Sequence, residues 1–239
     1  MNSAPSPLAV LVTGATGPGG RATARRMAGD GARVALNGSD PARLQAVLEE
    51  LGLPRDRAIA APGDLTDPAA AREVVATVEQ AFGRVDVVAH LVGGWAGGTA
   101  VADLDHEEVR TMLDQHLWTT LNILQATIPG MRDRGYGRLI GVSTPFASTP
   151  GPRGAAYAIA KSSVELLLRT AAKEVAADGV TANVLVMRTL DDERSRAQQP
   201  NAKRNAWTTP EELAEAIAWL ASPGAAAVNG ARISLDGRG

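Results

Sequence analysis

Short hydrophobic runs alternate along the chain with longer stretches in which hydrophobic positions recur every three or four residues. The short runs are continuous and rich in Val, Leu and Ile, which is typical of strands covered on both faces. They predict strands at residues 8–13, 33–36, 58–60, 85–89, 138–142, 181–186 and 232–235. The longer stretches predict helices over residues 20–29, 41–51, 68–82, 107–134, 155–177 and 210–221.

This alternation predicts the α/β fold class, with a doubly wound parallel sheet and helices on both of its faces. No repeat or linker divides the chain, so we expect a single domain over residues 8–239. Residues 1–7 lack the features of a secretory signal and predict a short disordered tail. Residues 189–209 are polar and aperiodic, and we interpret them as a substrate lid, because a loop of that length is usually functional or disordered.

Composition narrows the function classes. The 239 residues carry a net charge of −2, which argues against a nucleic-acid partner. There are no cysteines and only three histidines, so disulfides and thiolate chemistry are excluded and we expect no metal site. No hydrophobic run approaches the ~20 residues of a membrane span, and we expect a cytoplasmic protein without a membrane partner.

A glycine-rich turn, Thr-Gly-Ala-Thr-Gly-Pro-Gly-Gly, follows the first expected strand and precedes the first expected helix. Glycines let such a backbone bend and approach a dinucleotide pyrophosphate, which binds at the positive N-terminus of the helix. The expected cofactor contacts in this turn are Gly14, Thr16, Gly17 and Gly20. Pro18 removes one N–H donor, but proline suits the first helical position.

The end of the second strand bears on the choice of cofactor. An acidic residue at that place binds the ribose hydroxyls of NAD. The first acidic residue here is Asp40, two positions past the expected place. Asn37, Ser39 and Arg43 could instead bind a 2′-phosphate, so the sequence favours NADP(H) over NAD(H). The alternative is that these residues form a simple polar turn.

Tyr157 and Lys161 are four residues apart, so both side chains project from one face of the same expected helix. A nearby cation favours the phenolate and lowers the pKa of a phenol. A phenol tuned in this way can pass a proton to a reacting oxygen. Together with the glycine turn, the pair predicts hydride transfer between a nicotinamide cofactor and a carbonyl-like group of a small molecule.

These motifs, with Gly63-Asp64-Leu65 and the chain ending at residues 229–237, resemble the short-chain dehydrogenase/reductase family over nearly the full length. The resemblance implies a Rossmann-type sheet of about seven parallel strands. It also implies that Asp64 binds the adenine amine, that Leu65 covers the ring, and that Lys161 binds the nicotinamide ribose. A homodimer or homotetramer built on the two long helices is a further implication.

Several positions depart from the family pattern. The Asn-Asn-Ala-Gly motif reads His-Leu-Val-Gly here and contributes Val92 and Gly93 as expected cofactor contacts. The family's active-site asparagine aligns with His116, either as a proton relay or as a buried structural histidine. The family's serine, thirteen residues before the tyrosine, falls on Thr144. Ser143 is the alternative if the loop is one residue longer.

A narrower similarity links the chain to the dihydropteridine reductases. It rests on Gly-Gly-Trp-Ala-Gly-Gly at 93–98, Trp118-Thr119, Thr189-Leu190-Asp191 and Trp207-Thr208. Trp95 and Trp207 lie in loops expected beside the substrate and predict a planar cyclic substrate. The leading hypothesis is an NADP(H)-dependent reductase of a carbonyl or quinonoid group, with Tyr157 as proton donor. The alternatives are a quinonoid dihydropteridine reductase-like enzyme and, because Met187-Arg188 replaces a Pro-Gly pair, a nucleotide-binding sensor or scaffold with reduced turnover.

Overall fold

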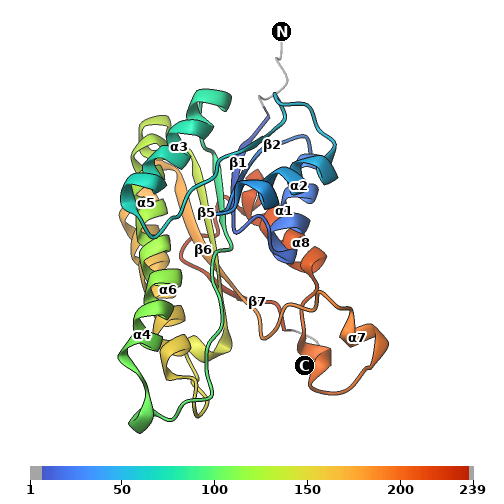
Figure 1. Cartoon of the computed structure of the whole chain (residues 1–239). Helices are drawn as coiled ribbons and strands as arrows, with labels where there is room; N and C mark the ends of the chain where they lie inside the picture. Colours follow the sequence, from blue (N-terminus) through green and yellow to red (C-terminus); the bar gives the residue numbers. More distant parts are fainter. Residues whose placement is uncertain (1–6, 237–239) are drawn as a thin grey trace.

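The computed structural model describes residues 7–236. Residues 1–6 of the expected tail lie outside this part of the chain, as do residues 237–239. One sheet of seven parallel strands, in the order β3-β2-β1-β4-β5-β6-β7, forms the middle layer (Figure 1). The fold class expected from the sequence is confirmed.

Each strand lies on one of the hydrophobic runs. The strands are β1 Ala9–Thr13, β2 Arg33–Asn37, β3 Ala58–Ala60, β4 Val87–His90, β5 Gly137–Ser143, β6 Val180–Val186 and β7 Arg232–Ser234. Strand β1 pairs with both β2 and β4, which places Thr13 beside Asn37 and His90. The order of the strands reverses at this point, so the loops after β1 and β4 diverge and leave a crevice at the carboxyl edge of the sheet.

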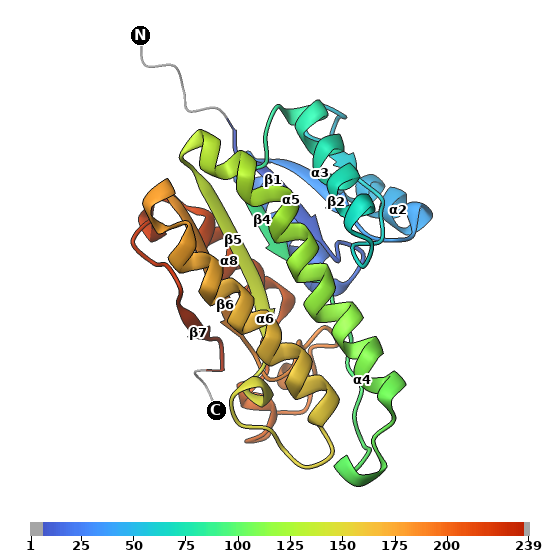
Figure 2. The same ribbon diagram turned by 90° about the vertical axis from the view of Figure 1, so that its left-hand side faces the viewer.

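Helices cover both faces of the sheet (Figures 1 and 2). One face carries α3 Pro68–Phe82, α5 Thr119–Arg134 and α6 Ala155–Glu174, and the other carries α1 Pro18–Gly29, α2 Pro41–Leu51 and α8 Pro210–Ala221. Side chains alternate along a strand. Leu11 therefore packs in the hydrophobic core under α3, α5 and α6, while Val10 and Val12 pack in the core under α1, α2 and α8. Within residues 7–236, each helix is too short or too polar to cross a lipid bilayer.

Short polar side chains fix where the helices begin. Asp40 caps α2 by accepting hydrogen bonds from the backbone N–H groups of Ala42 and Arg43. Asp67 caps α3 in the same way through the N–H of Ala69. A proline follows each cap, where its fixed φ suits the first helical position. The first acidic residue after β2 is therefore engaged in starting a helix.

The helix expected over residues 107–134 is interrupted. Helix α4 covers His106–Leu113, and a π-helical turn over Asp114–Trp118 separates it from α5. The hydroxyl of Thr120 donates to the carbonyl of His116 at 2.6 Å, a side-chain bond that competes with the backbone ladder. Hydrophobic periodicity does not report one widened turn, so the sequence predicted a continuous helix.

Residues 189–209, expected to be an aperiodic loop, contain ordered local structure. Helix α7 covers Ser195–Gln198, a 3₁₀ turn covers Arg204–Ala206, and a β-bridge joins Leu190 to Thr208. The segment projects from the body of the domain beyond α8 (Figure 1). Its two ends are held together at the carboxyl edge of the sheet.

Candidate active site

A cavity of about 260 Å³ opens at the carboxyl edge of the sheet, near the reversal of strand order. Its walls come from the glycine turn, the segment after β4, the π-helical turn, the end of β5, helix α6 and the segment after β6. The side chains that carry candidate chemistry in this lining are Trp95, His116, Ser143, Tyr157, Lys161 and Arg188. Residues far apart in the sequence thus share one site, as is usual in open parallel sheets.

Helix α6 supplies Tyr157 and Lys161 from its first two turns. Their spacing of one turn places both on the face that lines the cavity. The Lys161 ammonium donates to the carbonyl of Val142, at the end of β5, at 3.0 Å. Thr144 is the hydrogen-bonding neighbour that lowers the pKa of the Tyr157 phenol. The end of β5 therefore contacts both members of the helical pair.

Ser143 and Thr144 are distinguished by their surroundings. Thr144 lowers the pKa of the Tyr157 phenol, but it is not among the described residues that line the cavity. The hydroxyl of Ser143 is buried beside the cavity and has no hydrogen-bond partner among the described residues. One hydroxyl is thus coupled to the phenol, and the other is an unsatisfied group at the cavity wall.

Burial shifts the pKa values of both Tyr157 and Lys161. It raises the pKa of the Tyr157 phenol above its usual value, and the hydrogen bond with Thr144 lowers that pKa in part. This direction is opposite to the lowering expected from a lysine one turn away. Burial also lowers the pKa of Lys161 to about 8, while the Glu165 carboxylate opposes this shift. At neutral pH the phenol is therefore protonated, and Lys161 is near its titration point.

His116 lies on the π-helical turn, and its ring packs edge-on to Tyr157 with 5.8 Å between centroids. Its Nε2 lies 3.0 Å from the carbonyl oxygen of Gly94, which can only accept, so Nε2 carries the proton. Its Nδ1 is buried without a partner among residues 7–236. Burial, helped by the Lys161 charge, lowers the pKa of His116 to about 3. The imidazole is therefore neutral and offers one free acceptor.

A second histidine joins the strands next to the site. His90 Nδ1 lies 2.8 Å from the hydroxyl of Thr13, and its Nε2 lies 3.4 Å from the hydroxyl of Thr119. Burial and the Lys161 charge lower the pKa of His90 to about 3. Sequence reasoning did not identify these two threonines as partners of His90, because a threonine in a strand or helix carries no signal of a long-range partner.

The glycine turn fits a pyrophosphate. Gly14 has a φ of +64°, and a Cβ there would lie 2.6 Å from the carbonyl oxygen of Leu91. A Cβ at Gly20 would lie 2.3 Å from the carbonyl oxygen of Gly14. Gly17 differs, because a Cβ there would meet only one described atom, at 3.6 Å. Gly17 also precedes the 12-residue helix α1, so an anion can approach an open helix N-terminus.

A second cavity, of about 510 Å³, extends from the glycine turn to the end of β2. Thr16, Ser39, Arg43, Asp64 and Leu65 are among its lining residues. The two cavities share five lining residues and are therefore adjacent at the turn: Gly14, Gly17, Leu91, Val92 and Gly93. Such a two-part crevice has the division that a dinucleotide requires.

Asn37 corrects one expectation from the sequence. Its amide donates to the carbonyls of Ala61 and Gly63, at 3.0 and 3.1 Å. Both N–H donors are used in tying β2 to the segment after β3, so they are not offered to a phosphate. Asn37 lines this cavity together with Ser39 and Arg43, neither of which has a side-chain hydrogen bond of this kind to the described segment after β3.

The turn that carries Asp64 is held from two sides. The Asp64 carboxylate accepts hydrogen bonds from the backbone N–H and the hydroxyl of Thr66, at 2.9 and 2.8 Å. Asn122 of α5 donates to the carbonyls of Leu65 and Thr66, at 2.9 and 3.1 Å. Sequence reasoning missed Asn122, since a polar residue inside a helix does not reveal what it reaches.

Comparison with known proteins identifies this arrangement. A family model described as enoyl-(acyl carrier protein) reductase matches residues 17–237, a span that includes strand β2 and the Tyr157–Lys161 pair. The chain belongs to the short-chain dehydrogenase/reductase family. It is therefore an NAD(P)-dependent oxidoreductase.

Individual relatives cover nearly the whole of this short-chain dehydrogenase/reductase. The (2S)-(R)-hydroxy(phenyl)methylsuccinyl-CoA dehydrogenase subunit of Thauera aromatica is 31% identical over 238 residues, 95% of this chain and 92% of that protein. The D-beta-hydroxybutyrate dehydrogenase of Rhizobium meliloti is 29% identical over 252 residues, 95% and 96% of the two chains. A solved short-chain type dehydrogenase/reductase from Mycobacterium ulcerans has a TM-score of 0.86 at 27% identity, covering 95% and 88%.

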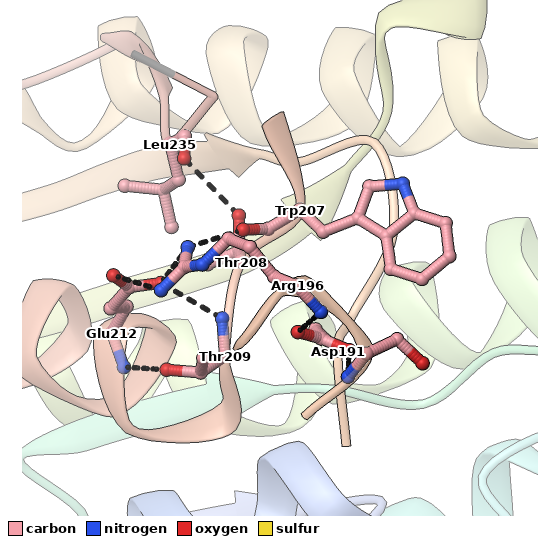
Figure 3. Close-up of polar contacts among 8 residues, drawn as sticks. Asp191, Arg196, Trp207, Thr208, Thr209, Glu212 and Leu235 are labelled. Carbon is pink, nitrogen blue, oxygen red and sulfur yellow. Dashed lines mark hydrogen bonds and ion pairs between the residues drawn. The ribbon is translucent and has the colours of Figure 1, made fainter. Parts of the chain in front are cut away.

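In this short-chain dehydrogenase/reductase a polar cluster fastens residues 189–209 to α8 (Figure 3). Asp191 accepts hydrogen bonds from two backbone N–H groups at the start of α7, including that of Arg196 at 2.9 Å. The Arg196 guanidinium donates to both carboxylate oxygens of Glu212, at 2.9 Å each, and to the carbonyl of Trp207 at 2.6 Å. Glu212 also accepts from the N–H of Thr209, which completes the capping box of α8.

The two tryptophans expected to face the substrate are placed differently. Trp95 lines the cavity and is 70% exposed. Trp207 is not among the described residues of the cavity wall. Its ring lies 5.6 Å from the Arg204 guanidinium, and its indole points away from the polar cluster (Figure 3). The pair of aromatic faces expected from the sequence is therefore not assembled around the cavity in this conformation.

Proposed function

We propose that this enzyme reduces a carbonyl or quinonoid group of a cyclic substrate with NADP(H), and that Tyr157 donates the proton. The single observation that carries the proposal is that Tyr157 and Lys161 line the same cavity as the glycine turn, with Thr144 as the hydrogen-bonding neighbour that lowers the pKa of the Tyr157 phenol. Burial raises the pKa of the phenol and so keeps the donor protonated at neutral pH.

The roles of the neighbouring groups follow from their positions. Thr144 orients the phenol and holds the reacting oxygen, and Ser143, which lines the cavity, is the alternative hydroxyl for this role. Lys161 binds the nicotinamide ribose and stabilises negative charge on Tyr157 after proton transfer. His116 offers its free Nδ1 as an acceptor in a path for proton resupply. The nicotinamide supplies the hydride when it is bound.

NADP(H) is preferred in this proposal because of the corner formed after β2. Asp40 is engaged in the cap of α2, and Ser39 and the Arg43 guanidinium line the cavity beside it. A cation and a hydroxyl at this corner suit a 2′-phosphate, which an acidic residue would repel.

A flat cyclic substrate is favoured by Trp95, which presents a large aromatic face at the cavity wall. The Thauera aromatica relative is named for a substrate with a phenyl group, whereas the Rhizobium meliloti relative is named for an aliphatic hydroxy acid. Quinonoid dihydropteridines belong in the tests, because they are planar and the stretch around Trp95 resembles the reductases that act on them.

Residues 189–209 serve as the lid in this proposal. The segment borders the cavity through Thr189 and Leu190, and the contacts of Arg196 with Glu212 hold its far part on α8. A lid that is held on α8 in this way can close over a substrate and exclude water without unfolding.

The proposal includes a cytoplasmic homodimer or homotetramer. Trp118, Ile159 and Leu166 are 45%, 50% and 62% exposed on the outer side of the π-helical turn and α6. Large apolar side chains grouped on neighbouring helices are typical of a subunit interface.

The test of the proposed function is an assay of NADPH and NADH oxidation with cyclic ketones, quinones, quinonoid pterins and short aliphatic ketones. We expect turnover with a cyclic compound and NADPH, and loss of that turnover in Tyr157→Phe. Cofactor binding without turnover of any carbonyl or quinonoid compound would contradict the proposal.

A further inference from the structure

An ion pair between a buried carboxylate and a partly exposed guanidinium lies beside the candidate active site. The Glu165 side chain is 9% exposed and the Arg232 side chain is 33% exposed. The single Nε–H of Arg232 donates a bifurcated hydrogen bond to the two Glu165 carboxylate oxygens, at 3.0 and 3.2 Å. Glu165 is one turn after Lys161 on α6, so both project from the same helix face. Arg232 comes from β7, at the far edge of the sheet.

The same guanidinium also reaches the loop that carries Thr144. Its Nη2 donates to the Thr144 carbonyl at 3.4 Å and to the Ser148 hydroxyl at 3.1 Å. The rigid planar fork of an arginine can join two such groups at once, which a lysine ammonium cannot do with the same geometry. Arg232 therefore connects the helix that carries Tyr157 and Lys161 to the loop that carries Thr144.

We propose that Glu165 and Arg232 are a positioning pair for the active site: Arg232 fixes the Thr144 loop against α6, and Glu165 places a negative charge one helical turn from Lys161. This inference rests on the proposed roles of Tyr157, Lys161 and Thr144. Neither Glu165 nor Arg232 lines the cavity among the described residues, so both act through other groups.

The other titratable groups around Lys161 are uncharged, so the role of stabilising its ammonium falls to Glu165. His90 from β4 and His116 from the π-helical turn are neutral, since burial lowers the pKa of each to about 3. Tyr157, on the same helix, is protonated because burial raises its pKa. The end of β5 contributes an uncharged carbonyl. Within the described chain, Glu165 is the group that raises the pKa of Lys161 against the effect of burial.

Glu165 and Arg232 have opposite effects on the pKa of Lys161. Glu165→Gln removes the anion and leaves the Arg232 cation, so the pKa of Lys161 falls. Arg232→Gln leaves the anion without its partner, so the pKa of Lys161 rises. A pair that only held the fold together would lower stability in both variants and would not shift the titration in opposite directions.

The chain suits a direct measurement because it contains three lysines, Lys161, Lys173 and Lys203. Lysine labelled with ¹³C at Cε gives three NMR signals in the cofactor-free protein, and Lys161→Met assigns the relevant one. We expect its pKa to shift down by about one unit in Glu165→Gln and up by about one unit in Arg232→Gln. Glu165→Asp keeps the charge and should titrate close to the wild type.

Asp86→Asn is the matched control, because Asp86 is a buried carboxylate paired with Arg84 at 2.7 Å. Asp86 directly precedes β4, so it lies at the amino ends of the strands, away from the active site. This substitution should lower the melting temperature and leave the Lys161 titration in place. An unchanged Lys161 pKa in a folded Glu165→Gln, or shifts of the same sign in Glu165→Gln and Arg232→Gln, would overturn the proposal.

The loop arm is tested by kinetics on the same variants. Arg232→Gln should lower kcat about tenfold, with the Kd for NADPH unchanged, because the Thr144 loop loses its anchor. An unchanged kcat would overturn this arm. The titration needs no turnover. If the variants show the expected Lys161 shifts but the wild type reduces no carbonyl compound, the proposed function is refuted and the electrostatic inference stands.

Discussion

Thr144 is the hydrogen-bonding neighbour that lowers the pKa of the Tyr157 phenol, while the adjacent Ser143 has a buried hydroxyl without a described partner. Thr144 directly follows β5 and Tyr157 lies in the first turn of α6, so the two residues bring together two elements at the carboxyl edge of the sheet. Two neighbouring hydroxyls in unlike surroundings can be tested separately.

Thr144→Ala should lower kcat/KM by roughly 10²-fold, since it removes a donor from the position of the reacting oxygen. Thr144→Ser retains the hydroxyl and should keep most of the activity. Ser143→Ala removes an unsatisfied buried hydroxyl and should be neutral or stabilise the fold by about 1 kcal/mol. Steady-state kinetics and urea unfolding check these values; a larger kinetic loss in Ser143→Ala than in Thr144→Ala would reverse the assignment.

Tyr157→Phe should reduce kcat by ~10²–10⁴ and leave cofactor affinity unchanged, because it removes the proposed proton donor. The chain has one other tyrosine, Tyr136, whose hydroxyl donates to the carbonyl of Ala221 at 3.3 Å outside the cavity. Tyr136→Phe is therefore the control and should retain normal kcat. Calorimetric titration of NADPH with both variants separates binding from turnover, and normal activity in Tyr157→Phe would place the acid elsewhere.

The pH profile of reduction should have an alkaline limb and no histidine limb. Lys161 has a pKa lowered to about 8, so activity should fall as the pH rises through that value and the ammonium is lost. His116 has a pKa of about 3 and stays neutral between pH 5 and 8. His116→Asn should keep the profile flat in that range. A wild-type limb near pH 6 that disappears in His116→Asn would show that the imidazole titrates during turnover.

Arg43→Ala should weaken NADPH binding about tenfold, close to 1.4 kcal/mol, and change NADH binding little. Gly38→Asp should move the preference towards NADH by placing a carboxylate at the end of β2. A Cβ at Gly38 would make only ordinary contacts, 3.5 Å from side-chain carbons of Leu44 and Thr16, so the fold accepts this change. Fluorescence titration of both cofactors decides; a tenfold wild-type preference for NADH would remove the NADP(H) assignment.

Stability should decrease as the pH falls from about 6.5 towards 3, because the pKa values of the folded His90 and His116 are lowered from 6.5 to about 3. In this window the unfolded chain binds protons that the folded chain does not, which favours unfolding. His90→Gln should make the decrease shallower. Urea unfolding at pH 5 and pH 7 measures it, and an equal loss of stability in wild type and His90→Gln would show that other groups control acid unfolding.

The sequence by itself determined the elements and the main chemical groups. Continuous hydrophobic runs identified the seven strands, and helical periodicity predicted α2 and α3 over residues 41–51 and 68–82, because both signals are local. The glycine turn was recognisable since its steric requirement, at Gly14 for example, is met within a few residues. The spacing of Tyr157 and Lys161 placed them on one helix face for the same reason.

Only the tertiary structure decided which groups meet. Asn37 was assigned to a phosphate from its position, yet its donors are taken by carbonyls after β3. The burial that raises the pKa of Tyr157 depends on elements folded over it, and spacing to Lys161 alone gave the opposite direction. Glu165 and Arg232 pair across 67 residues of sequence. Such contacts depend on three-dimensional distance and on the exclusion of water, and neither is encoded in any local pattern.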